Sequence, residues 1–272
     1  MNRSLRAFVR SVRGMFALTV VAAAVLPPRA WCGQPLETES ARLSPPGRLA
    51  IELGLERQTS SSGTEFALPF ALEYGISDRL ELVIEPVPYT LIHDKGVSKQ
   101  SGPGDLEATL TALVSAERAG RPAVAVAGEL KVPTARNSRI GTGKPDASAY
   151  LIASKHIGRW DAHADVGYTL VGRPAGVAVS NTVSFALAGE LHATRRLDFV
   201  GEVFGSTGAI PESHGGRLSG AESLTTPELG GGELVGQVGL RLHAAGNLTY
   251  ALGVSVDNNA AIVVHPGLTL AW

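Results

Sequence analysis

Residues 265–272 read HPGLTLAW, and this stretch indicates how the whole chain folds. Every second position carries a large apolar side chain: Leu268, Leu270 and Trp272. The positions between them are glycine, threonine and alanine. Such a period of two is the pattern of a β-strand that has one apolar face. A bulky aromatic residue is unusual at the last position, because chain ends commonly fray, so we expect Trp272 to have a use there.

The same alternation returns along the chain in segments of about ten residues. The segments are 49–56, 66–74, 80–85, 105–115, 124–132, 146–157, 160–171, 182–192, 198–203, 233–243, 248–256 and 260–272. Short polar connections alternate with longer links, which fall near residues 92–103, 134–145, 172–180 and 208–232. Up-and-down barrels of the outer membrane have this asymmetry, with short periplasmic turns and long external loops.

A secreted β-sandwich also has strands with one apolar face, so it is the main alternative. Strand length separates the two folds, because soluble strands average about five or six residues whereas a tilted membrane strand needs about ten. An even number of strands allows closure, and a closed sheet leaves no backbone edge unpaired in lipid. We therefore predict an all-β protein in which residues 48–272 form a closed antiparallel up-and-down transmembrane β-barrel of about twelve strands.

The first 33 residues have the features of a secretory signal peptide. They contain five arginines and no acidic residue, and the apolar run MFALTVVAAAVL occupies residues 15–26. That run is too short for a membrane-spanning helix, which needs about 20 residues. We expect residues 1–33 to be cleaved, residues 34–47 to form a periplasmic N-terminal lead, and the protein to reach the cell outer membrane.

Composition excludes several classes of protein. Without the five leader arginines, 19 basic residues face 25 acidic ones, so the mature net charge is near −6. This balance leaves no basic patch for a nucleic acid. The single cysteine, Cys32, lies at the expected cleavage region, so no cysteine pair is available for a disulfide scaffold.

The polar faces of the predicted strands carry more acidic than basic side chains. In a barrel whose apolar face meets lipid, the polar side chains line the lumen. The predicted lumen-lining residues are Glu52, Glu73, Glu81, Glu85, Glu107, Glu129, Lys131, Asp161, His163, Asp165, Glu190, His192, Asp198, Glu202 and Arg241. Opposite charges on neighbouring strands can instead fill a narrow barrel, and twelve strands lie between filled barrels of about eight and open ones of about sixteen. An open pore and a plugged barrel both remain possible at this stage.

Three histidines on the polar faces, His163, His192 and His243, are candidates for a catalytic base or a metal ligand. A site that cleaves lipid must face lipid near the rim, whereas these histidines share the face of the carboxylates. The segment GTGK at residues 141–144 lacks the first glycine and the following serine or threonine of a phosphate-binding loop. We therefore expect no catalytic residue, no cofactor and no metal site, and hence no enzyme.

Five longer segments resemble one protein family, labelled "Putative MetA-pathway of phenol degradation". They are GPGDLEATL (102–110), ELKVPTARNSRIGTGKPDASAYLIASKHIG (129–158), DVGYTLVG (165–172), FVGEVFG (199–205) and GNLTYALGVSVDNNAAIVVHPGLTLAW (246–272). Members of this family are commonly described as outer-membrane transporters, so the resemblance implies passage of small solutes, aromatic compounds among them. Ala135 stands where the family often has glycine, so this loop departs from the family pattern.

Together these features predict a passive channel or transporter for small solutes. A non-conducting barrel with a structural or binding role is the alternative, and an outer-membrane lipid hydrolase is a third. The expected partners are outer-membrane lipid, a small-molecule solute and the machinery that assembles outer-membrane barrels; no nucleic acid is expected. The predicted assembly signal is the outward set Leu268, Leu270 and Trp272, whose aromatic member also suits the interfacial belt.

Overall fold

The computed structural model describes residues 33–209, 232–244 and 247–272, whose strands form one sheet of sixteen segments. The segments are β1 Leu49–Gly54, β2 Glu56–Thr59, β3 Gly63–Leu68, β4 Phe70–Ser77, β5 Leu80–Pro86, β6 Tyr89–Asp94, β7 Gln100–Gly102, β8 Leu106–Ser115, β9 Ala123–Val132, β10 Asp146–Ile157, β11 Trp160–Leu170, β12 Thr182–His192, β13 Leu197–Ser206, β14 Glu233–His243, β15 Leu248–Asp257 and β16 Ile262–Ala271. The predicted signal peptide, except for Gly33, lies outside the described residues. Within those residues, no helix is long and apolar enough to cross a membrane.

The sixteen segments make twelve wall strands, because four strands in the first part of the chain are each divided in two. The divisions fall at Leu55, at Pro69, at residues 87–88 and at residues 103–105. Three of these breaks contain a proline, which has no N–H to donate to the ladder. The strands from β9 to β16 are continuous. The expected closed barrel of twelve antiparallel strands is therefore confirmed.

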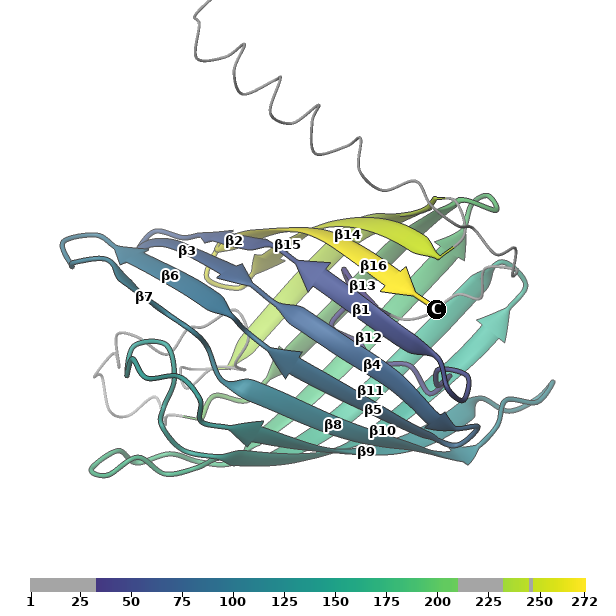
Figure 1. Ribbon diagram of the computed structural model, residues 1–272, viewed down its shortest axis with the longest axis horizontal. Helices are drawn as coiled ribbons and strands as arrows, with labels where there is room; N and C mark the ends of the chain where they lie inside the picture. Colours follow the sequence, from purple (N-terminus) through teal and green to yellow (C-terminus); the bar gives the residue numbers. More distant parts are fainter. Residues whose placement is uncertain (1–32, 210–231, 245–246) are drawn as a thin grey trace, which may run out of the picture.

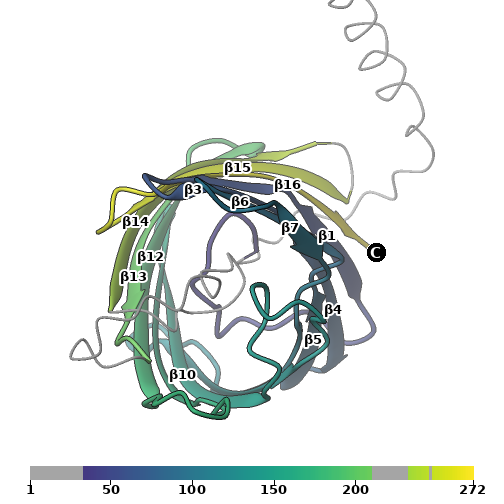
Figure 2. The same cartoon turned by 90° about the vertical axis from the view of Figure 1, so that its left-hand side faces the viewer.

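The first strand closes the ring by pairing with the last (Figure 1). In this closing pair Ala50 lies opposite Ala271, and Gly54 lies opposite Gly267. The amide of Trp272 donates to the carbonyl oxygen of Leu49, and the Leu49 amide donates back, both over 3.0 Å. Figure 2, which looks along the barrel, shows the resulting ring of strands. A closed ring leaves no unpaired strand edge, as the hydrocarbon of a membrane requires.

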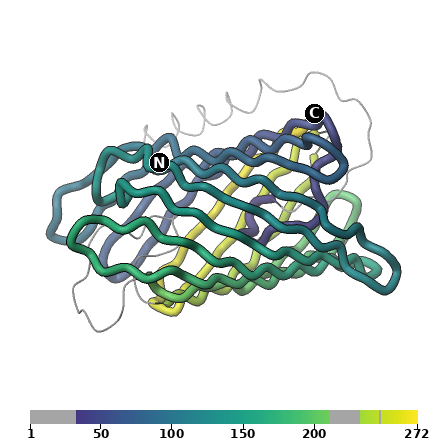
Figure 3. The backbone as a smooth tube through the Cα atoms, turned by 90° about the horizontal axis from the view of Figure 1, so that it is seen from below, coloured from purple at the N-terminus to yellow at the C-terminus, as the bar shows by residue number. Residues whose placement is uncertain are grey.

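Charged side chains are buried in this barrel and large apolar ones are exposed, the reverse of a soluble protein. On β10, for example, Ile152 and Ser154 are buried, whereas Leu151, which points to the other side of the strand, is 55 % exposed. The same exposed apolar surface continues around the wall through Val166, Leu187, Phe199, Val238, Leu252 and Ile262. A continuous apolar surface on obliquely running strands (Figure 3) matches the lipid-facing side of an outer-membrane barrel. The protein is therefore an outer-membrane barrel.

The two ends of the barrel differ. One end has the short connections at residues 78–79, 158–159 and 193–196. The other end has the longer links, among them residues 133–145 and 171–181. The link expected near residues 92–103 is shorter than predicted and spans only residues 95–99, because β6 continues to Asp94 and β7 begins at Gln100.

Candidate functional site: the barrel interior

The structure places the predicted lumen residues on the side of the wall opposite to the exposed apolar side chains. Ten of them are buried: Glu52, Glu81, Lys131, Asp161, His163, Asp165, Glu190, Asp198, Glu202 and Arg241. Five are half-buried: Glu73, Glu85, Glu107, Glu129 and His192. Strand alternation explains this placement, because successive side chains point to opposite faces. In a closed barrel the face away from the apolar surface is the interior.

One side of the interior is dominated by carboxylates. Glu85 on β5 lies directly opposite Glu107 on β8, and Glu107 lies opposite Lys131 on β9. Lys131 forms an ion pair with Asp146, which was not among the predicted residues. Glu129 accepts hydrogen bonds from the side chains of Ser148 and Tyr150, each over 3.2 Å. Like charges directly opposite each other destabilise a sheet, so the Glu85–Glu107 pair calls for a functional explanation.

The opposite side of the interior is organised around Arg241 on β14. Its Nη1 atom lies 2.6 Å from Glu190 Oε2, and both side chains are almost completely buried. The other carboxylate oxygen, Glu190 Oε1, lies 3.5 Å from Nε2 of His163. Nδ1 of His163 lies 2.8 Å from the hydroxyl of Ser154, so this histidine belongs to a buried polar network and does not face lipid.

Residues 34–47, expected only as a periplasmic lead, cross the barrel interior (Figure 2, purple). Glycines of the wall, which have no side chain, leave room for the beginning of this lead. A Cβ atom on Gly267 would lie 2.0 Å from Oε1 of Gln34, and one on Gly253 would lie 2.6 Å from Cβ of Pro35. Nε of Arg241 also donates to the carbonyl oxygen of Gln34 over 2.8 Å. The wall is thus shaped to receive the lead.

Further along, wall carboxylates accept hydrogen bonds from the backbone of the lead. Glu202 accepts from the amide of Glu37 over 2.9 Å and from the amide and hydroxyl of Thr38 over 3.0 and 2.7 Å. Asp165 accepts from the amide of Glu39 over 2.5 Å. The amide and hydroxyl of Ser44 donate to carboxylates on β5 and β4. Hydrogen bonds to ionised acceptors are stronger than neutral ones, so the acidic wall holds the lead in place.

The link of residues 133–145 also turns toward the interior, and Figure 2 shows it within the outline of the ring. Nη2 of Arg139 lies 2.6 Å from Oδ2 of Asp94, and the side-chain amide of Asn137 donates to Gln100 over 3.0 Å. Ile140, in the same link, is buried. These contacts fix the link against β6 and β7, so it narrows one end of the barrel.

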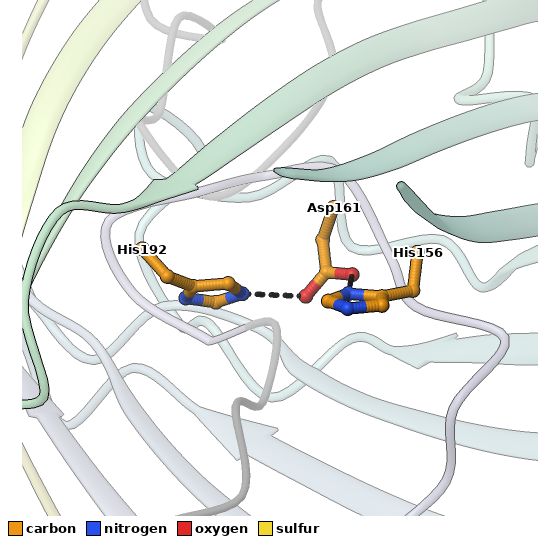
Figure 4. Close-up of side chains that lie close together, drawn as sticks. All are labelled: His156, Asp161 and His192. Carbon is orange, nitrogen blue, oxygen red and sulfur yellow. Dashed lines mark hydrogen bonds and ion pairs between the residues drawn. The ribbon is translucent and has the colours of Figure 1, made fainter. Parts of the chain in front are cut away.

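A row of histidines and aspartates lies at the end that has the short connections. His156, Asp161 and His192 come together there from β10, β11 and β12 (Figure 4). Nδ1 of His156 and Nε2 of His192 each lie 2.8 Å from a different oxygen of Asp161. Nδ1 of His192 lies 3.0 Å from Asp198, which also lies 2.6 Å from Nε2 of His243. The row therefore alternates imidazole and carboxylate across five strands.

Arg42 of the lead reaches this row and connects it to the turn that follows β8. Its Nη1 atom lies 2.8 Å from Asp161 Oδ1, and its Nη2 atom lies 3.1 Å from Glu117 Oε2. Lys155 also contacts Glu117, with Nζ 2.8 Å from Oε1. Partial burial acts to raise the pKa of Glu117, but the bonds from Lys155, His156 and Arg42 outweigh it and hold this pKa below its ordinary value.

Sequence reasoning missed His156 and Arg42, and it gave the lead no place in the lumen. His156 was detectable, because it shares the parity of Ser148, Tyr150 and Ser154 on one predicted strand. Arg42 was not, because nothing in an irregular segment tells which wall residue it meets.

The three residues of the predicted assembly signal lie on the outer face of β16 and just after it. Leu268 and Leu270 are half-buried there, and Trp272 is 59 % exposed.

The family model described as "Putative MetA-pathway of phenol degradation" matches residues 33–220. The chain belongs to this family. The matched region of this MetA-pathway family member begins with the lead and includes the acidic side of the interior and the rim row as far as Asp198. Among curated proteins, none matches the chain.

Solved structures share the barrel fold of this MetA-pathway family member. An outer membrane channel from Pseudomonas putida F1 matches with a TM-score of 0.68 and 12 % sequence identity, covering 87 % of this chain and 100 % of that chain. NanC porin matches with a TM-score of 0.55 and 8 % identity over 81 % and 98 % of the two chains. KdgM porin matches with a TM-score of 0.51 and 8 % identity over 80 % and 98 %. At these identities the likeness shows the fold.

Proposed function

We propose that this outer-membrane barrel is a passive channel for small solutes. The observation that carries the proposal is the Glu85–Glu107 pair on the inner wall. Within the described residues, neither side chain forms an ion pair or a hydrogen bond, and both are only half-buried. A dry, packed plug would pair such charges, because an unpaired charge that is removed from water is costly. Carboxylates in this position need water and cations beside them, which a solvated lumen supplies.

Glu39 of the lead lies within the same negative field. Glu39 retains accessible surface but lies among wall carboxylates. Enclosure in the barrel raises the pKa of Glu39 well above its ordinary value, and the negative charges of Glu85 and Asp165 raise it further. A lumen lined by one sign of charge concentrates ions of the opposite sign, and acidic rings are typical of cation-preferring pores. We infer that the channel prefers cations and neutral solutes to anions.

We infer the class of solute from the description of the family. Its name connects the protein with phenol degradation, so small aromatic compounds are the substrates we infer. A neutral aromatic compound interacts weakly with the acidic wall, whereas its carboxylate derivative is repelled. Half-buried Tyr150, which donates its hydroxyl to Glu129, is an interior aromatic group against which such a solute can pack.

Replacing both Glu85 and Glu107 with glutamine is expected to lower the cation preference measurably. The exchange keeps the shape of the side chains and removes two adjacent negative charges from the interior. At physiological salt the Debye length is about 8 Å, so the effect is large in a modest pore and weakens at high salt. The reversal potential across a planar bilayer under a salt gradient measures it.

Asp78→Asn is the matched control for this measurement, because it removes a negative charge from an exposed turn outside the lumen. Its reversal potential should equal that of the wild type. An anion-selective wild type, or a Glu85→Gln/Glu107→Gln variant with unchanged selectivity, would contradict the proposal.

Two other functions receive less support. A non-conducting structural barrel is favoured by one observation, namely that the lead occupies part of the interior, and removal of the lead distinguishes the two cases. A lipid hydrolase requires a site that meets lipid. The side chains of His163, His192 and His243 instead bond to buried interior groups, so we infer that the protein is not an enzyme.

We further propose that Leu268, Leu270 and Trp272 are the segment by which the barrel assembly machinery recognises β16. Trp272→Ala should lower the amount of folded barrel in the membrane several-fold, whereas Trp272→Phe should be tolerated. The closing bonds between Leu49 and Trp272 are made by the backbone and survive both changes. The fraction of barrel that changes mobility on boiling in a denaturing gel measures assembly.

Trp160→Ala is the control for this experiment, because Trp160 is also an outward aromatic at the same end, with 52 % exposure. Loss of a general interfacial anchor would lower assembly equally in both alanine variants. Equal behaviour of Trp160→Ala and Trp272→Ala would therefore refute a recognition role for Trp272.

A further inference from the structure

The rim row described above contains a set of side chains suited to a metal ion. His156, Asp161 and His192 each offer one potential ligand atom, a ring nitrogen or a carboxylate oxygen, and these three atoms all lie within 4.8 Å of one another. They come from three neighbouring strands and point toward one another (Figure 4). Because each residue sits on a hydrogen-bonded strand, their backbone positions are fixed before any ion arrives. Side-chain rotations can then bring the three atoms around one centre.

We propose that His156, Asp161 and His192 bind a divalent transition-metal ion, with Zn²⁺ as the representative. Imidazole nitrogen and carboxylate oxygen are ordinary ligands of Zn²⁺, and three protein ligands leave a fourth position for water or a solute group. The site is accessible as well as anchored. The side chain of His156 is 51 % exposed and that of His192 is 25 % exposed, whereas that of Asp161 is only 4 % exposed.

The surroundings of His192 support this assignment. A histidine that binds a metal through one ring nitrogen usually donates the other N–H to a carboxylate, which fixes the ring and its tautomer. Asp198 provides that carboxylate, 3.0 Å from Nδ1 of His192, and leaves Nε2 directed at Asp161. Asp198 is itself held by Nε2 of His243 over 2.6 Å. Asp198 therefore orients the ring of His192 for the proposed ligand role.

Arg42 occupies one oxygen of Asp161, so the ion has to compete with a guanidinium group. The competition is favourable, because Arg42 keeps a second carboxylate partner in Glu117 and does not become an unpaired charge. A divalent ion then supplies more positive charge beside Asp161 and Asp198 than the guanidinium does. The acidic interior adjacent to the row also raises the local concentration of cations.

Titration of Zn²⁺ into the detergent-purified, untagged barrel, followed by isothermal calorimetry, tests this proposal. We expect one bound ion per chain. His156→Gln and His192→Gln should each weaken binding at least about tenfold, and Asp198→Asn should weaken it by about ten- to a hundredfold, as is usual for a residue that orients a ligand. A change of gel mobility on boiling shows whether each variant is folded, and exposed His156 is the safest of these positions to replace.

Two histidine variants serve as controls. His93→Gln changes an exposed histidine on β6 and should leave binding unchanged. His265→Gln disrupts a second group, Glu37, Glu56 and His265, whose potential ligand atoms also lie within 4.8 Å of one another, and it should leave binding unchanged too. Absence of Zn²⁺ binding, full binding in His156→Gln and His192→Gln, or loss only in His265→Gln would each overturn the proposal. These outcomes are independent of bilayer conductance, so they do not depend on the proposed channel function.

Discussion

Replacing Arg241 with alanine is expected to lower the free energy of unfolding by about 3–5 kcal/mol, the usual cost of breaking a buried ion pair by removing one partner. Glu190 is only 1 % exposed, and its opposite neighbour across the strands is another acid, Asp161. Without the guanidinium, two buried carboxylates lie side by side and the lead loses the bond to Gln34 O.

Urea-dependent refolding of the barrel into lipid vesicles measures this loss. Arg241→Ala combined with Glu190→Gln should recover most of the stability, because the second change removes the buried negative charge of Glu190 that the guanidinium no longer neutralises. Arg241→Lys should recover only part, since an ammonium group lacks the planar fork that serves Glu190 and the lead together. Arg195→Ala, at an exposed turn, should change stability by less than about 0.5 kcal/mol. A loss below about 1 kcal/mol in Arg241→Ala would show that water replaces the guanidinium in the lumen.

Strand alternation explains why so much of this fold could be predicted. Each wall strand has one face in lipid and one in the lumen, so apolar and polar side chains alternate with a period of two along its full length. The pattern places Glu190, Glu202 and Arg241 on one face without any tertiary information. The divided strands near residues 86–105 were harder to predict, because Pro88 and Pro103 interrupt the ladder without ending the wall strand. The pattern there looks like a shorter strand followed by a link.

Contacts between distant segments could not be predicted in this way. The lead has no periodicity, so the sequence gives no indication that the amides of Glu37 and Thr38 donate to Glu202, more than 160 residues away. The rim row depends on register across several strands. The parity of His156 and His192 is visible in the sequence, but their approach to the two oxygens of Asp161 follows from how far each strand is shifted along its neighbour.

Removal of residues 34–46 from the mature chain is expected to raise single-channel conductance by about twofold or more, because the lead occupies cross-section in a barrel of intermediate width. The twelve wall strands should still close, since the sheet is held by its own ladder and β1 pairs with β16 independently of the lead. Carboxylates such as Asp165 and Glu202, released from the amides of the lead, become available to water and to permeating cations. Cation preference should therefore increase together with conductance.

A pair of point variants separates loss of the lead from general damage to the wall. Glu202→Ala removes the acceptor of the hydrogen bonds from Glu37 and Thr38, so the lead is released locally and current fluctuations should increase. Glu202→Gln keeps one carbonyl acceptor in the same place and should resemble the wild type more closely. Single-channel recordings compare these variants with the deletion under the same salt. A wild type that does not conduct, together with a deletion variant that does, would mean that the lead is a plug. Equal conductance in the wild type and the deletion variant would mean that solutes pass the lead without needing its space.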